Sequence, residues 1–223
     1  MPKRFDLVIF DADGTLIDNR DAIRSNFNYA RQAQGYPPLP ESEIDAMIGT
    51  PLVEMYARTL PESARHLAPQ MAKMHAERYL TNCDKGIVIL DGAVSTLEYL
   101  RQNGFRSAVA TTKSTGGVQH LFQKIGLYDR FDMVVGVQDG IKPKPHPDMI
   151  YYILEQLQIG KERAVLVGDT PTDIETARNA GIQVIVVTTG VKLGFADFRE
   201  IRAMQPDLIV PSLPDVVDYL YTG

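Results

Sequence analysis

Six short apolar runs, rich in β-branched residues, constrain the fold of this chain more than any other feature. Runs of strand length that are apolar throughout are typical of parallel strands buried on both faces. Helical patterns separate them, and one of these, at 171–180, stops at Gly181 as a helix with a glycine C-cap does. Strands that alternate with helices predict an α/β fold with a doubly wound, Rossmann-like parallel sheet. The six runs are 7–10, 108–111, 133–135, 164–167, 184–187 and 208–210.

One interval breaks this alternation. From Asp21 to about Asn82 we find no convincing strand, and apolar residues follow helical spacing, as Ile23, Phe27 and Ala30 do. The interval therefore predicts an all-helical insertion after the first strand. We expect a Rossmann-like core domain of residues 1–16 and 86–223, and a small helical cap domain of residues 17–85.

Two acidic residues, Asp11 and Asp13, directly follow the first predicted strand. Open α/β sheets bind their ligands at the carboxyl ends of the strands. In an extended chain, residues two apart project to the same side, so these carboxylates are able to converge on one ligand. Gly14 then gives the backbone freedom to leave the strand. The alternative is an acidic turn whose carboxylates are solvated or cap a helix.

A second acidic pair, Asp169 and Asp173, follows the predicted strand 164–167. Asp173 alone is equally explained as an acidic residue in the first turn of a helix, where the dipole favours it. However, four carboxylates at two neighbouring strand ends would repel one another and any phosphate. Such a cluster makes sense around a hard divalent cation, and oxygen ligands with room for water suit Mg²⁺ better than zinc.

Two further segments supply a hydroxyl and an ammonium. Thr111 is expected at the end of a strand, and Lys144 lies in a proline-rich loop. Near a metal, these groups would bind phosphoryl oxygens and neutralise charge in the transition state. Each is weak alone, because strand threonines often reflect β-propensity and Lys-Pro loops are often rigid turns. Lys142 also precedes a proline, but we choose Lys144, which Pro147 completes as Lys-Pro-x-Pro.

In chain order these motifs resemble those of the haloacid dehalogenase superfamily of phosphatases, and the resemblance covers nearly the whole chain. It rests on Asp-x-Asp-Gly-Thr at 11–15, Thr111, Lys144 and Gly-Asp-x-x-x-Asp at 168–173. The helical insertion resembles the superfamily's C1 cap. The segments Asp-Gly-Thr-Leu-Ile-Asp and Ile-Gly-Thr-Pro at 48–51 resemble phosphoglycolate phosphatases, although Thr112 stands where those relatives commonly carry Asn.

The resemblance implies a role for each motif residue. Asp11 would attack phosphorus to form an aspartyl-phosphate, and Asp13 would protonate the leaving oxygen and then activate water. The implied ligands of Mg²⁺ are Asp11, the backbone carbonyl of Asp13 and Asp169. Asp173 would act through a water molecule or by supporting one of these ligands. The implied substrate-binding residues are Gly49, Thr111, Thr112 and Lys144. Arg20, Arg24 and Arg58 are possible anion contacts in the cap.

These residues predict a phosphatase that hydrolyses a small phosphorylated metabolite. A pyrophosphatase or a β-phosphoglucomutase-like phosphomutase of the same superfamily would keep the same core residues and stays open. A dehalogenase is disfavoured, because halide displacement needs neither a second acid nor a metal. A phosphoryl-accepting regulatory domain also uses an Asp, a Thr, a Lys and Mg²⁺, but it needs neither Asp13 nor a cap that excludes water.

Composition limits the partners. The net charge of −5 argues against a general nucleic-acid or membrane-surface binder. The apolar runs are strand-sized, too short for a membrane span. The single cysteine, Cys83, is interpreted as a structural thiol in a reducing compartment, so we expect a cytoplasmic protein. The sequence leaves the oligomeric state open.

Overall fold

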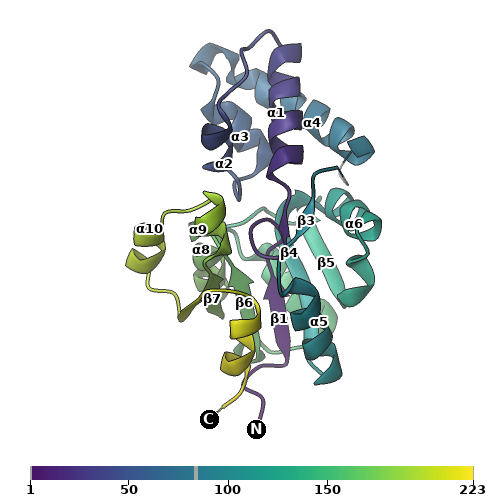
Figure 1. The fold of residues 1–223 in the computed structure, drawn as a ribbon, viewed down its shortest axis with the longest axis vertical. Coiled ribbons are helices and arrows are strands. Elements are labelled where there is room, and N and C mark those ends of the chain that lie inside the picture. The colour runs from purple at the N-terminus through teal and green to yellow at the C-terminus, as the bar shows by residue number, and fades with distance from the viewer. Residues whose placement is uncertain (1, 83–84, 223) are drawn as a thin grey trace.

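The computed structural model describes residues 2–82 and 85–222, so Cys83 lies outside the described residues. Its centre is a six-stranded sheet in the order β5-β4-β1-β6-β7-β8, with every pair of neighbours parallel (Figure 1). The predicted α/β fold is therefore confirmed, and each of the six apolar runs forms a strand. The strands are β1 Leu7–Phe10, β4 Arg106–Ser114, β5 Met133–Val137, β6 Ala164–Gly168, β7 Gln183–Val187 and β8 Leu208–Val210.

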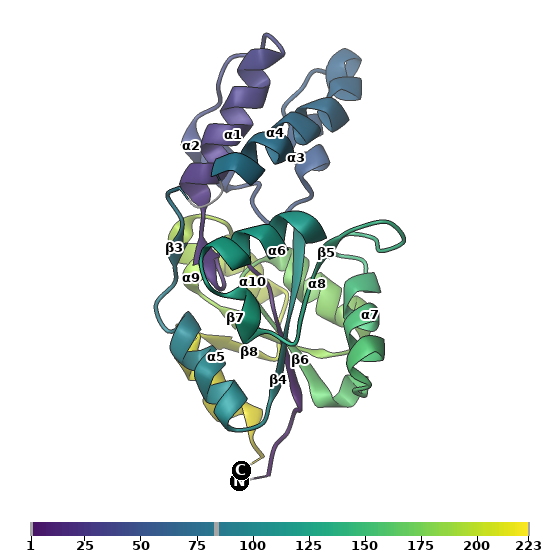
Figure 2. The ribbon, with the colours of Figure 1, turned by 90° about the vertical axis from the view of Figure 1, so that its right-hand side faces the viewer.

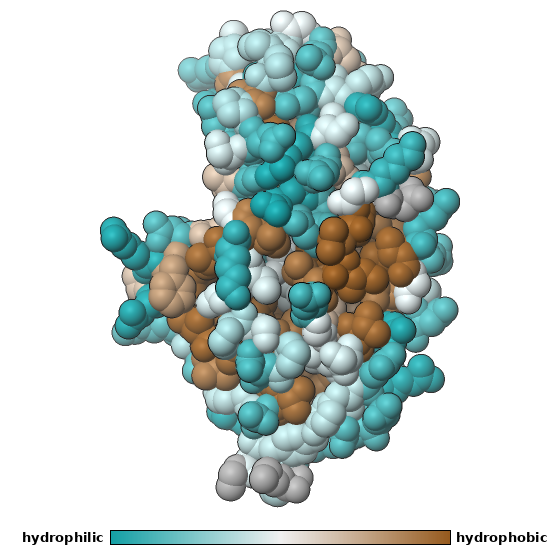
Figure 3. Space-filling model, in the orientation of Figure 1, coloured by the Kyte–Doolittle hydropathy of each residue, from teal (hydrophilic) through white to brown (hydrophobic). Residues whose placement is uncertain are grey.

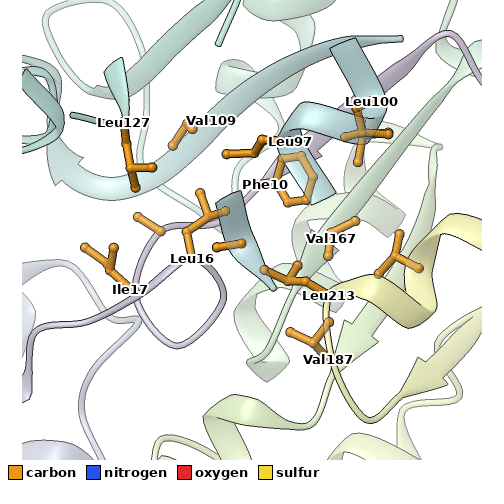
Figure 4. Close-up of a cluster of buried hydrophobic side chains, with 14 of the residues drawn as sticks. Phe10, Leu16, Ile17, Leu97, Leu100, Val109, Leu127, Val167, Val187 and Leu213 are labelled. Carbon is orange, nitrogen blue, oxygen red and sulfur yellow. The ribbon is translucent and has the colours of Figure 1, made fainter. Parts of the chain in front are cut away.

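Both faces of the sheet are covered by helices, because alternate residues of each strand point to opposite sides. In β1, Val8 and Phe10 pack into one apolar cluster, part of which Figure 4 shows, while Leu7 and Ile9 pack into the other. The first face carries α5 Ala93–Gln102, α6 Thr115–Lys124 and the 3₁₀ helix η4 Pro214–Leu220. The second face carries α7 Asp148–Leu157, α8 Pro171–Ala180 and α10 Phe198–Ala203. The remaining helices of this part are α9 Thr189–Leu193 and the 3₁₀ helices η2 Tyr128–Arg130 and η3 Lys161–Arg163.

A separate group of helices stands beyond one end of the sheet, as Figures 1 and 2 show. We call it the helical unit. Its residues pack around their own apolar cluster, which includes Phe27, Tyr56 and Met71, and hydrophilic residues cover much of its visible surface (Figure 3). Within the described part of 19–87 there is no strand, as the helical spacing predicts. Its helices are α1 Arg20–Ala33, α2 Glu41–Asp45, α3 Leu52–Arg58, the 3₁₀ helix η1 Glu62–Leu67 and α4 Ala68–Asn82.

Two short strands connect the helical unit to the sheet, and the sequence patterns did not predict them. β2 (Ile17–Asp18) pairs antiparallel with β3 (Val88–Ile89), so the two connections run side by side. Each strand has only two residues, too few to show a period of two. Among the described residues, no helix is long and apolar enough to cross a membrane.

Candidate active site

Three of the four sequence motifs meet at the carboxyl end of the parallel sheet, on the side of the helical unit. Asp11 directly follows β1, Asp169 directly follows β6, and Asp173 lies in the first turn of α8. Lys144 lies in the loop that precedes α7. These residues are buried, with exposed fractions of 3% for Asp11, 1% for Lys144 and 0% for Asp169 and Asp173. The structure thus brings together residues up to 162 positions apart in the sequence.

Lys144 joins two of the carboxylates. Its Nζ lies 2.8 Å from Oδ1 of Asp11 and 2.6 Å from Oδ1 of Asp173. Burial acts to lower the pKa of Lys144, but the charges of Asp11 and Asp173 outweigh it and raise the pKa above its ordinary value. Lys144 therefore stays an ammonium ion between the two carboxylates.

Asp173 is held by hydrogen bonds at the start of α8. Its Oδ2 accepts hydrogen bonds from the backbone N–H groups of Asp169 and Thr170 and from the Thr170 hydroxyl, at 3.2, 3.0 and 2.7 Å. Its Oδ1 accepts from Lys144. The helix-terminal role that the sequence left open is therefore present, and both oxygens already have protein partners.

Asp11, Asp169 and Asp173 form a cluster that fits a divalent cation. Each offers a carboxylate oxygen, and these oxygens lie within 4.8 Å of one another. Burial, then the charges of Asp173 and Asp13, raise the pKa of Asp11 to about 7 against the opposing charge of Lys144. Burial and the charges of Asp173 and Asp11 also raise the pKa of Asp169 well above its ordinary value. Without a cation, these carboxylates are poorly compensated.

Asp169 gives the most direct test of that fit. The Thr15 hydroxyl donates to its Oδ1 at 2.6 Å, but its buried Oδ2 has no hydrogen-bond partner among the described residues. Two glycines leave room for this oxygen, because a Cβ on Gly14 or Gly190 would lie only 2.2 or 1.9 Å from it. A buried carboxylate oxygen without a donor is costly unless a ligand binds it. An all-oxygen donor set suits a hard cation such as Mg²⁺.

Asp13 has a cation of its own, which sequence reasoning missed. Its Oδ2 lies 2.8 Å from Nζ of Lys113, and its buried Oδ1 has no hydrogen-bond partner among the described residues. Burial acts to lower the pKa of Lys113, but the Asp13 charge outweighs it and raises the pKa, so Lys113 stays charged. The sequence could have indicated Lys113 as a site residue. Thr111 and Lys113 are two residues apart in an extended segment, so their side chains project to the same side.

Thr111 is buried at 1% exposure, and Thr112 is half-buried. The structure differs from the expectation that Thr111 ends its strand, since β4 continues to Ser114. Its register with β5 shifts between Ala110 and Ser114, so Thr111 lies in an irregular stretch of the strand. The regular parallel pairing therefore ends where the sequence motif begins.

The helical unit reaches the site at Gly49. A Cβ built on Gly49 would lie 3.1 Å from Cγ2 of Thr170, next to Asp169, and the φ of +96° at Gly49 favours glycine. Arg20 also donates to the carbonyl oxygen of Leu193, at 3.1 Å. Phe195, which follows α9, packs within the apolar cluster of the helical unit. The site therefore lies at the contact between the sheet and the helical unit.

Comparison with known proteins gives a consistent result. A family model described as haloacid dehalogenase-like hydrolase matches residues 8–187. The chain is 30% identical to the pyrophosphatase PpaX of Halalkalibacterium halodurans, over 95% of this chain and 94% of that protein. It is 31% identical to a phosphoglycolate phosphatase of Pectobacterium atrosepticum, over 93% of this chain and 89% of that protein.

A solved structure shares the fold as well. A haloacid dehalogenase-like family protein from Streptococcus pneumoniae superposes with a TM-score of 0.84 at 26% identity, covering 98% of this chain and 99% of that one. The match extends over the sheet and the helical unit together. This chain belongs to the haloacid dehalogenase-like hydrolase family.

Proposed function

We propose that this protein is a Mg²⁺-dependent phosphatase that hydrolyses small phosphate monoesters, in the manner of a phosphoglycolate phosphatase. The observation that carries the proposal is the separation of two ion pairs, Lys144 with Asp11 and Lys113 with Asp13. Two buried carboxylates with different partners suit two different roles, one as nucleophile and one as proton carrier. The names of the relatives, pyrophosphatase and phosphoglycolate phosphatase, support phosphoryl chemistry.

In the proposed reaction, a carboxylate oxygen of Asp11 attacks phosphorus, and the bond from phosphorus to the ester oxygen breaks. Asp13 donates its proton to that leaving oxygen. Asp13 then takes a proton from the water that attacks the aspartyl-phosphate, which releases inorganic phosphate and restores Asp11. The covalent intermediate divides one difficult displacement into two easier steps.

The other site residues have binding roles in this proposal. Asp11, Asp169 and the backbone carbonyl of Asp13 would hold Mg²⁺, with Asp173 acting through water because both its oxygens have protein partners. When bound, the cation supplies positive charge to the phosphoryl oxygens. The remaining substrate-binding residues would be Thr111, Thr112, Lys144 and Gly49.

We also propose that residues 17–85 act as a cap domain on a core of residues 1–16 and 86–223. The separate apolar cluster of the helical unit and the paired connections β2 and β3 support this division. A cap over the site would exclude bulk water during phosphoryl transfer. Its contact at Gly49 would place cap residues beside the substrate.

The test is phosphate release by the purified protein from phosphoglycolate, pyrophosphate, sugar phosphates and nucleotides, with Mg²⁺ or with EDTA. We expect release that requires Mg²⁺. Asp11→Asn should abolish it, whereas Asp6→Asn should retain it, because Asp6 pairs with Arg163 away from the site. Substantial turnover by the Asp11→Asn variant would contradict the assignment of the nucleophile. Transfer of phosphate between positions of a sugar phosphate, without release, would indicate a mutase instead.

A further inference from the structure

The proposed hydrolysis assigns no role to the ammonium group of Lys113. Its side chain is only 15% exposed, and its Nζ lies 2.8 Å from Oδ2 of Asp13. Nζ also lies 5.3 Å from the ring centroid of Tyr79 in α4. Lys113 of the sheet therefore sits at the contact with the helical unit, beside the carboxylate that would protonate the leaving group.

An ammonium group at this place has hydrogen-bonding capacity to spare. It carries three N–H donors, and among the described residues Asp13 is the one carboxylate in ion-pair contact with it. Lys144 differs, because it already serves two carboxylates, Asp11 and Asp173. Lys113 is thus better placed than Lys144 to accept a further anionic partner.

The arginines of the helical unit that the sequence suggested as anion contacts are engaged elsewhere. Each guanidinium pairs with a carboxylate near it in the sequence or in the same unit, and none of these carboxylates has a role in the proposed reaction. The pairs are Arg20 with Asp18, Arg24 with Asp45, and Arg58 with Glu54. Lys113 differs from them because its own partner is Asp13, the proposed proton carrier, so its charge lies beside the position of the leaving group.

Geometry limits where on the substrate that substituent can be. Asp13 must come within about 3 Å of the leaving oxygen to donate its proton. Since Nζ of Lys113 lies 2.8 Å from Oδ2 of Asp13, the ammonium is within about 6 Å of a leaving oxygen that Oδ2 protonates. An anion that is bonded directly to the leaving oxygen, or one carbon from it, has its own oxygens about 3 Å away from it by ordinary bond lengths. Such an anion reaches Lys113, whereas one at the far end of a sugar or nucleotide does not.

We propose that Lys113 is a specificity-determining residue that binds a second anionic group next to the leaving oxygen of the substrate. This inference rests on the proposed phosphatase function. It names the substrate class as short, doubly anionic phosphates, in which the second anion is either a carboxylate, as in phosphoglycolate, or a phosphoryl group, as in pyrophosphate.

The first experiment compares turnover of three substrates: phosphoglycolate, pyrophosphate and the neutral amide of phosphoglycolate. The wild-type protein should prefer at least one of the two anionic substrates to the amide. Lys113→Met should lower kcat/KM for the preferred anionic substrate by about 10- to 100-fold, the effect of a lost charge-assisted hydrogen bond, mainly through KM. The amide should lose much less. Lys113→Arg should keep part of the preference, and Lys142→Met, at an exposed lysine, should keep all of it.

Comparing the substrates distinguishes the two kinds of anion that Lys113 would bind. A loss confined to phosphoglycolate identifies a carboxylate, and a loss confined to pyrophosphate identifies a phosphoryl group. An equal loss for all three substrates would overturn the proposal, because Lys113 would then act only through Asp13. Equal use of phosphoglycolate and its amide by the wild-type protein, with no use of pyrophosphate, would overturn it as well.

A binding measurement keeps this inference separate from the proposed hydrolysis. In an Asp13→Asn background, Lys113 has no ion pair to lose, so adding Lys113→Met leaves no carboxylate unpaired at this position. Calorimetric titration with phosphoglycolate and with the amide should show that the single variant binds the charged ligand more tightly and the double variant does not. No preference in the single variant would refute the role of Lys113. Absence of turnover in the wild-type protein, with the binding preference intact, would refute only the hydrolysis.

Discussion

Asp11→Asn should make the metal-free protein more stable at neutral pH, although it removes the proposed nucleophile. Asp11 is 3% exposed, and its pKa rises from 3.8 to about 7 on folding, chiefly through burial. A carboxyl group whose pKa is higher in the folded state favours folding when protonated. Its contribution is fully present below about pH 4 and is lost as the pH rises to about 7.

The pKa shift gives the magnitude. The pKa of Asp11 is about three units higher in the folded state than in the unfolded state. At about 1.4 kcal/mol for each unit of pKa, this difference corresponds to about 4 kcal/mol of unfolding free energy. Asparagine has nearly the same shape and keeps an oxygen that can accept from Lys144, but it carries no charge. We therefore expect the variant to exceed the wild-type protein in stability by up to about 4 kcal/mol above pH 7.

The assay is urea unfolding in EDTA from pH 5 to pH 8, with Asp6→Asn as the matched control. Hydrogen bonding to Arg163 lowers the pKa of Asp6, so that substitution should reduce stability, by at most about 1 kcal/mol for so exposed a pair. Mg²⁺ at a hundred times its dissociation constant should stabilise the wild-type protein by about 2.7 kcal/mol and the Asp11→Asn variant by less. An Asp11→Asn variant that is less stable than wild type in EDTA at pH 8 would refute the reasoning.

Two further predictions test the helical unit and the metal site. Burial lowers the pKa of His75 to about 3. Below about pH 6.5 the unfolded state binds a proton at this histidine and the folded state does not, so the free energy of unfolding should fall by up to about 1.4 kcal/mol per pH unit. His75→Gln should give a shallower acid limb in urea unfolding, and an unchanged limb would contradict this. Gly190→Ala should weaken Mg²⁺ binding measured by calorimetry, because its Cβ would lie 1.9 Å from Oδ2 of Asp169. Gly116→Ala, also in a helix but with nothing within 4 Å of its Cβ, should leave binding unchanged, and an equal effect of both would count against the crowding argument.

The strands of the sheet were predictable because the strand segments that are buried on both faces are almost entirely apolar. Leu7 to Phe10 are all 0% exposed, so their run carries no polar residue to obscure it. The pair β2 and β3 was not predicted, because a strand of two residues cannot display a period of two. Val88 is also 58% exposed, so its apolar side chain does not mark a buried strand. The convergence of Asp11 and Asp169 was predictable for a different reason, since the carboxyl ends of neighbouring parallel strands meet at one edge.

Other parts of the site depend on how side chains reach one another in space. The pairing of Lys113 with Asp13 joins β4 to the segment after β1, with 2.8 Å between Nζ and Oδ2. The closeness of Gly190 to Asp169 depends on how α9 packs against the end of β6. Residue spacing within one helix or strand cannot predict either contact, because each contact joins elements that are distant along the chain.

The distribution of cations within the site locates the place where a metal is most needed. Lys144 compensates Asp11 and Asp173, and Lys113 compensates Asp13, so two ammonium groups face four buried carboxylates. Asp169 has only the Thr15 hydroxyl, and its Oδ2 has no donor among the described residues. A divalent cation beside Asp169 would balance the two remaining negative charges. Lys113, whose partner is Asp13, would then remain as the cation beside the leaving group of the substrate.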